Sequence, residues 1–522
     1  MKTTVEIKKM GINGEGIGYI NRKIVFIKGA LLNEEVEIDA KQYNNKNYYF
    51  GDLIRVIKPS PMRVKNPCRA NKECMGCNLL HYAYPAQLKH KKDLIKESLK
   101  KYTELDRSQI KIDQIIGMNQ KNGFLTQANL PIVDFKGKVT FGIYQRETKY
   151  LTVMTGCMKQ HPLINQTLLQ LEEVFNNHQC KTYNDKFRTG LRFIKLRVFQ
   201  DKVQVIIITG KDGLKDEVVS DIKKIKQVNG LFMSINTSKY QDFESQGYKK
   251  IFGNTKEEFI CDGKKYIMSV KTTLPDHLES FEIRNKIVKT MVKGSKKIIS
   301  INCENGILEM NLDQEVVAID EKKDNIESAT YNAKLLGKEN IKFVYGQPIK
   351  KMVTFAKKKV YDTVIIQGVN GISNELKDTL RLGKVQTVIY MNSSTSMLAK
   401  DLQELSKYYK VEEIKAVDSH MYQSYVTSIA KLTKKYEKGI KMEYDYTPRG
   451  VCSRNIHVEV EDGIVKNVIF TGGCSGNTQG VAALAKGMKV DEVIERLKDI
   501  KCGAKPTSCP AQLAKSLQEH AK

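Results

Sequence analysis

The sequence contains no run of apolar residues as long as the roughly 18 that a membrane-spanning helix needs. Its first residues, MKTTVEIKKMGINGEG, also lack the apolar segment of a secretory signal peptide. No internal repeat with a period of about 20–50 residues is apparent, which argues against solenoid and propeller folds. We therefore expect a cytoplasmic protein that is not embedded in a membrane.

Acidic residues are scarce relative to basic ones: 59 Asp and Glu stand against 86 Lys and Arg, and the formal net charge is +27. An excess of this size favours a polyanionic partner, most often nucleic acid and less often an anionic membrane surface. A lysine-rich composition without a functional cause is the alternative. Residues 443–522 hold eleven basic and ten acidic side chains, so the excess lies in residues 1–442.

The composition is that of a globular protein. Hydrophobic residues make up 41% and charged residues 28% of the 522 positions, which excludes a disordered or a fibrous chain. At roughly 100–200 residues per domain, the length predicts three or four domains. The pattern along the chain predicts an α/β multidomain protein with four parts: residues 1–60, 61–285, 286–435 and 443–522.

The first part predicts a small five-stranded β-barrel. Gly14, Gly16 and Gly18 resemble a nucleotide-binding glycine run, but no helix follows them, so tight hairpin turns explain them better. The expected strands are residues 5–7, 17–19, 24–27, 35–38 and 48–57.

The next two parts differ in their hydrophobic pattern. Residues 61–285 predict a central α+β domain with a strongly basic helix at residues 86–102. Residues 286–435 alternate apolar runs with helical segments such as residues 324–336, which is the βαβ pattern of an open parallel sheet. The strands expected in this Rossmann-like domain are residues 298–301, 316–319, 363–366 and 388–391.

A polar, basic linker at residues 434–441 precedes a small α+β C-terminal unit. Its expected elements are strands at residues 457–460 and 465–470, a glycine-rich turn, TGGCSGNTQG, and helices at residues 490–497 and 511–517.

Cys68, Cys74 and Cys77 lie within ten residues, close enough in sequence for their thiolates to bind one metal centre. Cys157, in VMTGCMKQH, is the candidate fourth ligand. Iron–sulfur and zinc are both compatible with thiolate ligands. Three isolated cysteines are instead expected to be small buried residues: Cys180, Cys261 and Cys303.

These motifs resemble those of the RNA uracil-5-methyltransferases that carry an N-terminal TRAM domain and a 4Fe–4S cluster. The resemblance extends over residues 1–435 and includes KGALLNEEVEI, PCRANKECMGC, NLLHYAYPAQLKHKK and FGIYQRETKYLTVMTGC. It implies that the N-terminal part is a TRAM-type, OB-like barrel that binds RNA, either rRNA or tRNA. It also implies that Cys68, Cys74, Cys77 and Cys157 ligate the cluster, which makes residues 61–285 an iron–sulfur domain.

Members of this family add a cysteine thiolate to uracil C6 and remove the C5 proton with a carboxylate. The nucleophile motif aligns with IYMNSSTSMLAKDL and places Ser393 at the nucleophile position. The base segment aligns with DSHMYQSYVTSI and places Thr427 at the base position. The charged loop around the target base aligns with IIQGVNG, so that Gln367 stands at its start.

These substitutions remove the chemistry that the resemblance implies. A serine hydroxyl is almost never ionised near neutral pH without a dedicated base, and threonine is not a useful proton acceptor. No cysteine lies between Cys303 and Cys452, so no shift of the alignment restores the nucleophile.

The loop for the methyl donor, S-adenosylmethionine (SAM), is also altered. It aligns with SINCENGIL, in which Gly306 remains and Glu304 replaces the first glycine. The carboxylate of Glu304 would oppose the methionine carboxylate of SAM. Asp320 is retained where an acidic residue would bind ribose hydroxyls, and Pro275 replaces a glutamine that contacts SAM. The sequence therefore argues against tight SAM binding.

Residues 443–520 resemble the TSCPD domain, and the matching motifs are CSR, GGCSGN, GMKVDEVIERL, IKCG and TSCP. Its four cysteines are candidate ligands of a four-thiolate zinc site, with a redox pair or plain core positions as the alternatives: Cys452, Cys474, Cys502 and Cys509. The domain also occurs in adenosylcobalamin-dependent ribonucleotide reductases, which gives a weaker alternative function related to ribonucleotide reduction.

The leading hypothesis is an RNA-binding member of the SAM-dependent RNA (uracil-5-)-methyltransferases that lacks methyl transfer. The alternative is an active RNA methyltransferase that acts on rRNA or tRNA with an unconventional site.

Overall fold

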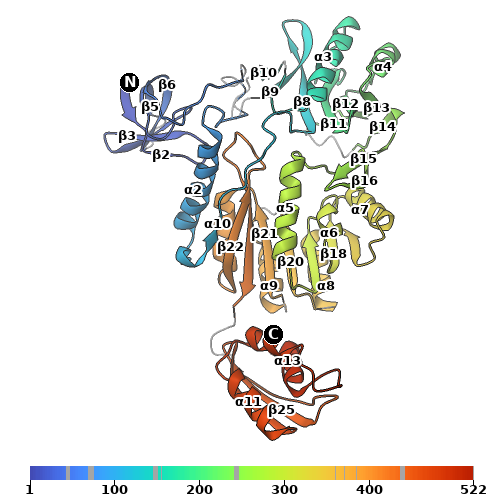
Figure 1. Cartoon of the computed structure of the whole chain (residues 1–522). Helices are drawn as coiled ribbons and strands as arrows, with labels where there is room; N and C mark the ends of the chain where they lie inside the picture. Colours follow the sequence, from blue (N-terminus) through green and yellow to red (C-terminus); the bar gives the residue numbers. More distant parts are fainter. Residues whose placement is uncertain are drawn as a thin grey trace.

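A computed structural model describes residues 1–42, 47–68, 74, 76–144, 151–154, 156–239, 246–358, 360–368, 371–383, 385–435 and 441–520. The chain is a mixed α/β protein with an N-terminal β unit, a central sheet, a Rossmann-like sheet below it and a C-terminal unit at the far end (Figure 1). Among the described residues, no helix combines the length and the apolar character needed to span a bilayer.

The N-terminal unit is a six-stranded sheet in the order β1-β5-β6-β4-β3-β2. Val36 and Ile38 of β5 are fully buried and alternate with more exposed residues, as the period of a half-buried strand requires. Five expected strands are present, and the count was short by one because two-residue β2 shows no period. Gly14 has a φ of 79° and lies in a turn, as interpreted, whereas Gly16 and Gly18 lie within β3, so the turn interpretation was wrong for these two glycines. The strands are β1 (Lys2–Glu6), β2 (Lys9–Met10), β3 (Gly16–Ile20), β4 (Lys23–Ile27), β5 (Glu35–Gln42) and β6 (Tyr48–Lys58).

Helix α2 (Tyr84–Tyr102) connects the N-terminal unit to the Rossmann-like sheet. Pro85 lies in its first turn, where no hydrogen-bonded N–H is required. Its apolar face joins the core of the Rossmann-like sheet through Ile95 and Leu99. On the same side, Ser98 Oγ donates to Thr395 Oγ1 at 3.0 Å. The helix is therefore fixed against the C-terminal half of the chain.

The central sheet has seven strands in the order β10-β9-β8-β11-β12-β13-β14, and α3 and α4 pack on its core. The two-stranded sheet β15-β16 follows and packs toward α5 and α6. The elements are η1 (Arg107–Gln109), β8 (Gln127–Phe135), β9 (Lys138–Tyr144), β10 (Leu151–Val153), α3 (Pro162–Asn177), β11 (Leu191–Phe199), β12 (Lys202–Thr209), α4 (Asp216–Lys223), β13 (Val228–Ile235), β14 (Lys249–Gly253), β15 (Lys256–Cys261) and β16 (Lys264–Ser269).

The Rossmann-like sheet has eight strands in the order β19-β18-β17-β20-β21-β23-β22-β7. Neighbours from β19 to β21 are parallel, whereas β23 is antiparallel to both β21 and β22. Alternate residues of β17 belong to two different cores, with Ile298 in one and Ile299 in the other. Both faces are therefore covered, as a parallel sheet requires.

The four strands expected here and the helix expected at residues 324–336 are confirmed to within about two residues. The strands are β7 (Lys111–Ile112), β17 (Lys297–Ile301), β18 (Glu315–Asp320), β19 (Ile341–Tyr345), β20 (Thr363–Gln367), β21 (Thr387–Asn392), β22 (Tyr409–Val417) and β23 (Thr427–Lys434). The helices are α5 (Leu278–Met291), α6 (Ile307–Met310), α7 (Lys323–Leu335), α8 (Pro348–Lys358), α9 (Asn374–Leu382) and α10 (Thr395–Leu405).

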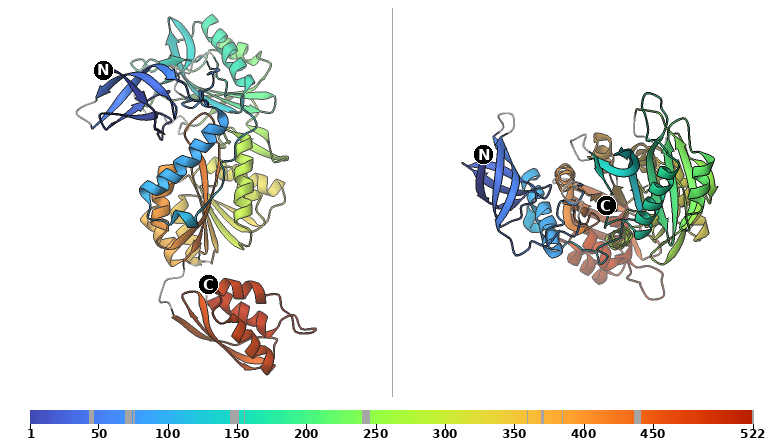
Figure 2. Two further views of the ribbon diagram at one scale, coloured as in Figure 1. Left: turned by 60° about the vertical axis from the view of Figure 1, so that its left-hand side comes forward. Right: turned by 90° about the horizontal axis from the view of Figure 1, so that it is seen from above.

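The C-terminal unit has its own antiparallel sheet and its own hydrophobic core. Figure 2 shows it as a separate body beyond the Rossmann-like sheet. The expected linker was too long, because β23 ends at Lys434 and β24 begins at Lys441; residues 436–440 lie outside the described part. The elements are β24 (Lys441–Tyr446), β25 (Ser453–Glu461), β26 (Ile464–Gly472), α11 (Ser475–Ala485), α12 (Val490–Leu497) and α13 (Cys509–His520).

The glycine-rich segment TGGCSGNTQG is only partly a turn. Gly472 and Gly473 have positive φ values of 81° and 87°, but α11 begins at Ser475, so the rest of the segment is helical. Packing does not require glycine at the two helical positions, since a Cβ at Gly476 or Gly480 would meet nothing within 4 Å. The prediction of a turn was therefore wrong for its second half.

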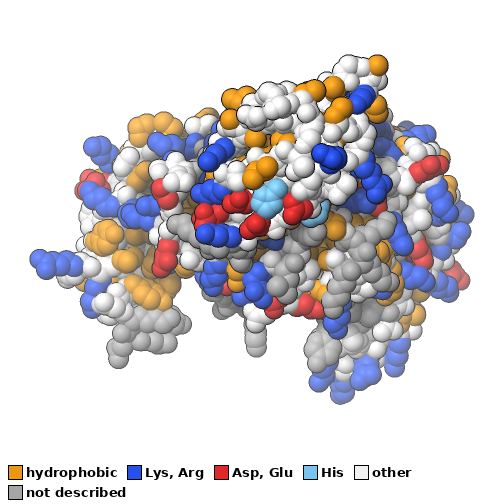
Figure 3. All heavy atoms as spheres, turned by 90° about the horizontal axis from the view of Figure 1, so that it is seen from below, with side chains coloured by type: hydrophobic (Ala, Val, Ile, Leu, Met, Phe, Trp, Pro, Cys, Tyr) orange, Lys and Arg blue, Asp and Glu red, His pale blue; other side chains and the backbone are white. Residues whose placement is uncertain are grey.

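Figure 3 views the molecule from the C-terminal end. Acidic side chains gather beside a histidine on this face, among Lys and Arg side chains. In the C-terminal sheet, His457 Nδ1 lies 3.3 Å from Asp445 and His457 Nε2 lies 3.5 Å from Glu443. This unit is thus mixed in charge, in keeping with its near-neutral sequence.

Candidate functional site

The predicted catalytic and cofactor positions meet at one edge of the Rossmann-like sheet. Strands β18, β20 and β21 are part of one parallel array, so their carboxyl ends lie at the same edge. Asp320 ends β18, Gln367 ends β20, and Ser393 follows β21. Open α/β sheets bind their ligands at this edge, which makes it the candidate functional site.

The two positions aligned with the nucleophile and the base are in direct contact. Thr427 opens β23, which pairs with β21 so that Asn392 lies opposite Ser428. This register places Ser393 Oγ 3.1 Å from Thr427 Oγ1. The contact therefore joins two neutral hydroxyl groups in place of a thiol and a carboxylate.

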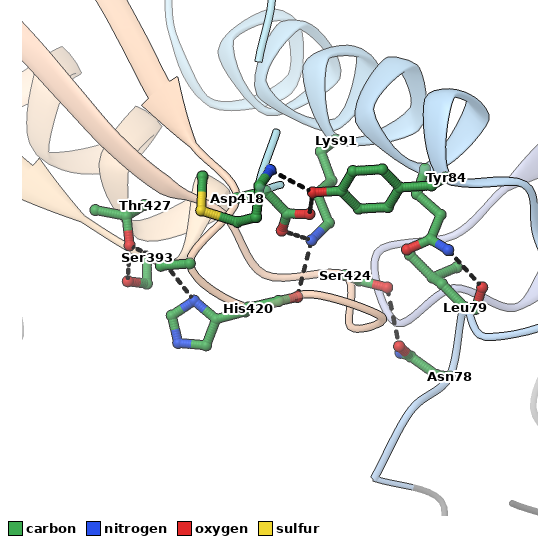
Figure 4. Close-up of polar contacts among 12 residues, drawn as sticks. Asn78, Leu79, Tyr84, Lys91, Ser393, Asp418, His420, Ser424 and Thr427 are labelled. Atoms are coloured by element: carbon green, nitrogen blue, oxygen red, sulfur yellow. Dashed lines mark hydrogen bonds and ion pairs between the residues drawn. The ribbon is translucent and has the colours of Figure 1, made fainter. Parts of the chain in front are cut away.

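The hydrogen-bonded chain continues beyond Thr427. Ser419 Oγ lies 2.5 Å from Thr427 Oγ1 and 2.9 Å from His420 Nδ1. Ser393, Thr427, Ser419 and His420 are here called the hydroxyl chain (Figure 4). Sequence reasoning missed His420, and the signal available was a histidine inside the segment DSHMYQSYVTSI that also carries Thr427.

His420 carries a neutral imidazole at neutral pH. Burial lowers its pKa below the usual 6.5, and the positive charge of Lys91 lowers the pKa further, while the carboxylates of Asp418 and Asp276 act in the opposite direction. A neutral imidazole has one nitrogen that accepts a hydrogen bond and one that donates. Its Nδ1 is thus able to accept a proton from Ser419.

Residues 418–424, here called the site loop, carry two members of the hydroxyl chain. From α2, Tyr84 Oη donates to Asp418 Oδ2 at 2.8 Å, and Lys91 Nζ donates to the His420 carbonyl at 2.9 Å (Figure 4).

Hydrogen bonds also join the site loop to the segment that follows Cys74. They run from Gln423 Nε2 to the Gly76 carbonyl at 2.8 Å, from the Leu79 N–H to the Tyr422 carbonyl at 3.0 Å, and from Asn78 Nδ2 to Ser424 Oγ at 3.2 Å. The predicted metal ligands and the site loop are therefore physically connected.

The carboxylate of Asp320 is already bound within the protein. The Glu304 N–H donates to Oδ2 at 2.9 Å, and the Lys322 N–H donates to Oδ1 at 2.8 Å. Asn325 Nδ2 also donates to Oδ1 at 3.1 Å. A ribose diol at this site would have to share an acceptor that holds the loop in place.

Glu304 adopts a left-handed backbone conformation with a φ of 50°, which is uncommon for a residue with a side chain. Burial raises the pKa of Glu304, and the charge of Arg284 on α5 lowers it. The predicted negative charge in the loop is therefore partly offset by a nearby guanidinium group.

Gly306 is required by packing within the loop. Its φ is 72°, and a Cβ at this position would lie 2.6 Å from the Phe343 ring and 2.8 Å from Ala329 Cβ. Glycine is thus needed here so that the loop can pack against Phe343 and Ala329. Its retention is not in itself evidence for a ligand.

Gln367 directs its side chain into the protein. Its Nε2 donates to Glu309 Oε1 at 3.1 Å, and Ser300 Oγ donates to the same oxygen at 2.6 Å. Burial raises the pKa of Glu309 to about 7, and its Oε2 is buried without a hydrogen-bond partner in the described part of the chain. Val369 and Asn370, the next residues of the aligned loop, lie outside the described residues.

Cys68, Cys74, Cys77 and Cys157 come together in the structure. Burial raises the pKa of the Cys77 thiol to about 11, the charge of Lys159 lowers it, and the three other thiols raise it further. The pKa of Cys74 is likewise raised by burial first and then by Cys157 and Cys68. All four sulfur atoms are therefore near enough to interact electrostatically.

The other cysteines are distributed differently. Cys261 and Cys303 are buried, as expected, but Cys180 is only half-buried. The ligand atoms of Cys261, Asp262 and Glu282 lie within 4.8 Å of one another, and no other trio of such groups among the described residues is as close. Asp262 in this cluster is neutralised by Lys286 at 2.7 Å.

Lys505 lies beside one of the C-terminal cysteines and is influenced electrostatically by two more. Lys505 Nζ donates to Cys452 Sγ at 3.4 Å, and the pKa of Lys505 is raised by Cys452, Cys502 and Cys509. Cys474 lies at the N-cap of α11 and is exposed. The ammonium group of Lys505 is thus in contact with the thiol of Cys452.

Comparisons with known proteins follow the same division of the chain. The TRAM domain family matches residues 2–54, and the TSCPD domain family matches residues 433–521. An uncharacterized RNA methyltransferase of Bacillus anthracis is 30% identical over 454 residues, which cover 83% of this chain and 96% of that protein. The chain belongs to this family of RNA methyltransferases.

An uncharacterized RNA methyltransferase of Halalkalibacterium halodurans is 29% identical over 436 residues, covering 81% of this chain and 94% of the relative. Among solved structures, the tRNA (uracil-54, C5)-methyltransferase of Pyrococcus abyssi in complex with S-adenosyl-L-homocysteine has a TM-score of 0.65 at 19% identity. The match covers 83% of this chain and all of that one, and it shows a shared fold. Membership of the RNA methyltransferases and the presence of TRAM and TSCPD domains, both inferred from the sequence motifs, are confirmed.

Proposed function

We propose that this RNA methyltransferase family member binds RNA, of the rRNA or tRNA class, and does not carry out cysteine-dependent methyl transfer to uracil C5. The observation that carries the proposal is the contact between Ser393 Oγ and Thr427 Oγ1 at 3.1 Å. A carbon such as C5 becomes nucleophilic only after a thiolate has added to C6, and its proton then needs a base. Two hydroxyl groups supply neither the thiolate nor the carboxylate.

The SAM loop supports the same proposal. Asp320 is bound by three protein donors, and Glu304 occupies the position aligned with a glycine. The family resemblance implies that the backbone approaches the cofactor at this position, and a side chain there would hinder that approach. The residues present do not fit SAM in the manner that the family resemblance implies, so we expect weakened binding.

The N-terminal unit offers a surface suited to RNA. Phe26, Tyr48 and Phe50 form an aromatic cluster on β4 and β6, with ring centroids 5.5–6.0 Å apart. Val25 and Ile27 are fully buried, so Phe26 between them points to the outer face of the sheet. Exposed aromatic rings on a basic protein are typical stacking platforms for unpaired bases.

The four N-terminal cysteines fit an iron–sulfur cluster better than a zinc ion. In a tetrahedral zinc site with Zn–S bonds of about 2.3 Å, the sulfur atoms lie about 3.8 Å apart. Among the described residues, no three of these cysteines lie within 4.8 Å of one another, although they interact electrostatically. We propose that Cys68, Cys74, Cys77 and Cys157 hold a 4Fe–4S cluster, which would cross-link the segment joined to the site loop.

We propose that the C-terminal cysteines do not hold a zinc ion. The ammonium group of Lys505 donates to Cys452 Sγ at 3.4 Å, a contact that a zinc ion bound to this thiolate would displace. Within the described ranges, no three of the C-terminal thiols are within 4.8 Å of one another. The zinc content of the full wild-type chain and of the Cys502→Ser variant tests this proposal. Equal zinc content in the two proteins would support the absence of a zinc site at the C-terminal cysteines.

Two measurements test the proposed function. Calorimetry with SAM should give no binding in the low micromolar range, and incubation of the full chain with SAM and total RNA should produce no 5-methyluridine. RNA binding itself should be present and should weaken steeply with salt, because basic side chains release counterions from the phosphates. Formation of 5-methyluridine would overturn the proposal.

A further inference from the structure

The hydroxyl chain has the geometry of a proton relay. Successive distances are 3.1 Å from Ser393 Oγ to Thr427 Oγ1, 2.5 Å from Thr427 Oγ1 to Ser419 Oγ, and 2.9 Å from Ser419 Oγ to His420 Nδ1 (Figure 4). Each hydroxyl has one proton and two lone pairs, so each is able to accept from one neighbour and donate to the next. The chain is therefore continuous from the sheet edge to an imidazole.

The donors along this chain have a common direction when Nδ1 of His420 is unprotonated. Ser419 then donates to His420, Thr427 donates to Ser419, and Ser393 donates to Thr427. This arrangement leaves the lone pairs of Ser393 Oγ available to a group at the sheet edge.

The surroundings of His420 maintain the neutral ring that such a relay needs. Charged groups of both signs face it from several elements: Lys91 of α2, Lys159 after β10, Asp276 before α5, and Asp418 of the site loop itself. The ring of Tyr425 lies 5.9 Å away, centroid to centroid. The two cations and the two carboxylates oppose each other, and burial then favours the uncharged imidazole.

We propose that the hydroxyl chain carries a proton from an N–H or O–H group of an RNA nucleotide at Ser393 to Nδ1 of His420. The nucleotide group loses a proton to Ser393 Oγ, the Ser393 proton moves to Thr427, the Thr427 proton to Ser419, and the Ser419 proton to His420. One proton is transferred overall, which leaves an anionic nitrogen or oxygen on the RNA and an imidazolium on His420.

The chemistry of this relay defines the class of substrate. Ring N–H groups and ribose hydroxyls carry protons that a base removes directly, whereas a uracil C5 proton becomes removable only after covalent addition at C6. A deprotonated nitrogen or oxygen is itself a nucleophile and needs no cysteine. The site is therefore matched to heteroatoms of RNA. This inference rests on the RNA binding of the proposed function and is compatible with loss of C5 chemistry.

The relay is tested without RNA by placing a thiol at its end. In the full-length Ser393→Cys variant, the rate of alkylation by iodoacetamide at the new thiol is followed against pH by mass spectrometry of the peptide that contains it. An intact relay gives the thiol a proton acceptor and raises the thiolate fraction near neutral pH. Addition of Thr427→Val or of His420→Phe should each slow this alkylation about tenfold at pH 7, and the two effects should not add.

A matched control separates the relay from general disturbance of the site loop. Ser424→Ala removes a hydroxyl of the same loop that bonds Asn78 and is outside the hydroxyl chain, so it should leave the alkylation profile unchanged. If Ser393→Cys has the same dependence of alkylation rate on pH with and without Thr427→Val, the relay is overturned. Additive effects of Thr427→Val and His420→Phe would also overturn it, because the two would then act separately.

RNA binding by the wild-type chain is measured in parallel by filter retention of labelled total tRNA and rRNA. Absence of RNA binding together with a coupled alkylation profile would refute the proposed function and the RNA substrate of the relay, while the proton path itself stands. Binding of RNA without coupling would refute the relay alone.

Discussion

Lys91 of α2 and Asp418 of the site loop form an ion pair in which neither side chain is exposed to solvent. The Asp418 carboxylate also accepts a hydrogen bond from Tyr84 Oη at 2.8 Å. A helix from the N-terminal half and a loop from the C-terminal half are thus joined by two buried charges. The loop that carries His420 depends on this junction.

Removal of one partner should be strongly destabilising. Lys91→Ala leaves the Asp418 carboxylate buried without its counter-charge, and we expect the free energy of unfolding to fall by about 3–5 kcal/mol in urea titrations. Lys89→Ala, on the exposed side of the same helix, should change it by no more than about 0.5 kcal/mol. Equal losses in the two variants would show that the buried pair has no special role.

Glu309 should make stability depend on pH. Its pKa is 4.5 in the unfolded chain and is raised to about 7 by burial, so between these values only the folded state holds the proton. Stability from this group is complete below pH 4.5 and is lost as the pH rises through about 7. Between about pH 5 and pH 8, the wild type should lose about 2.5 kcal/mol more than Glu309→Gln, which stays neutral. Parallel pH profiles would contradict this.

Phe50 should contribute to RNA affinity through stacking. It is 48% exposed, and loss of one base–aromatic stack costs about 1–3 kcal/mol, so Phe50→Ala should weaken RNA binding about tenfold or more. Phe135 is 49% exposed on a different sheet, and Phe135→Ala is the matched control. The salt dependence of binding should be the same in both variants, because no charge is removed.

The cysteine set should bind iron. Protein purified without oxygen should contain about four iron atoms per chain and absorb in the visible range, and Cys77→Ser should lose both properties. Cys180→Ser, outside the set, should retain them. Colourless protein with one zinc ion per chain that is lost on Cys77→Ser would contradict the cluster.

The same variant has a second expected effect. Because the segment after Cys74 is hydrogen-bonded to the site loop through Gly76 and Leu79, loss of the cluster should increase amide hydrogen exchange at residues 418–424. Unchanged exchange there would separate the cysteine set from the site loop.

Much of the fold was predictable because its signals are local. Period-2 alternation in β5, the apolar runs of β17 to β21 and the i, i+3, i+4 spacing of α12 each occur within one segment. Motif alignment likewise placed Ser393 and Thr427 at corresponding positions, and the antiparallel register of β21 and β23 brings them together.

The remainder of the site depends on contacts that no single segment encodes. His420 becomes a relay partner only because the site loop folds back and places Ser419 Oγ 2.5 Å from Thr427 Oγ1. The Asp320 carboxylate accepts a hydrogen bond from the Glu304 backbone N–H. The Gln367 side chain points into the protein because its Nε2 donates to Glu309 Oε1. None of these hydrogen-bond partners can be predicted from the type of the residue alone.

The hydrogen bond between Asn78 and Ser424 joins residues 346 positions apart in the chain. A ribosome releases α2 and the cysteine segment long before it releases the site loop, so these early elements emerge without their partners. Closure of so long a loop is slow relative to local folding. We expect the hydroxyl chain to be completed in the last step of folding, and a nascent chain stopped before residue 418 would expose Lys91 with no carboxylate to receive it.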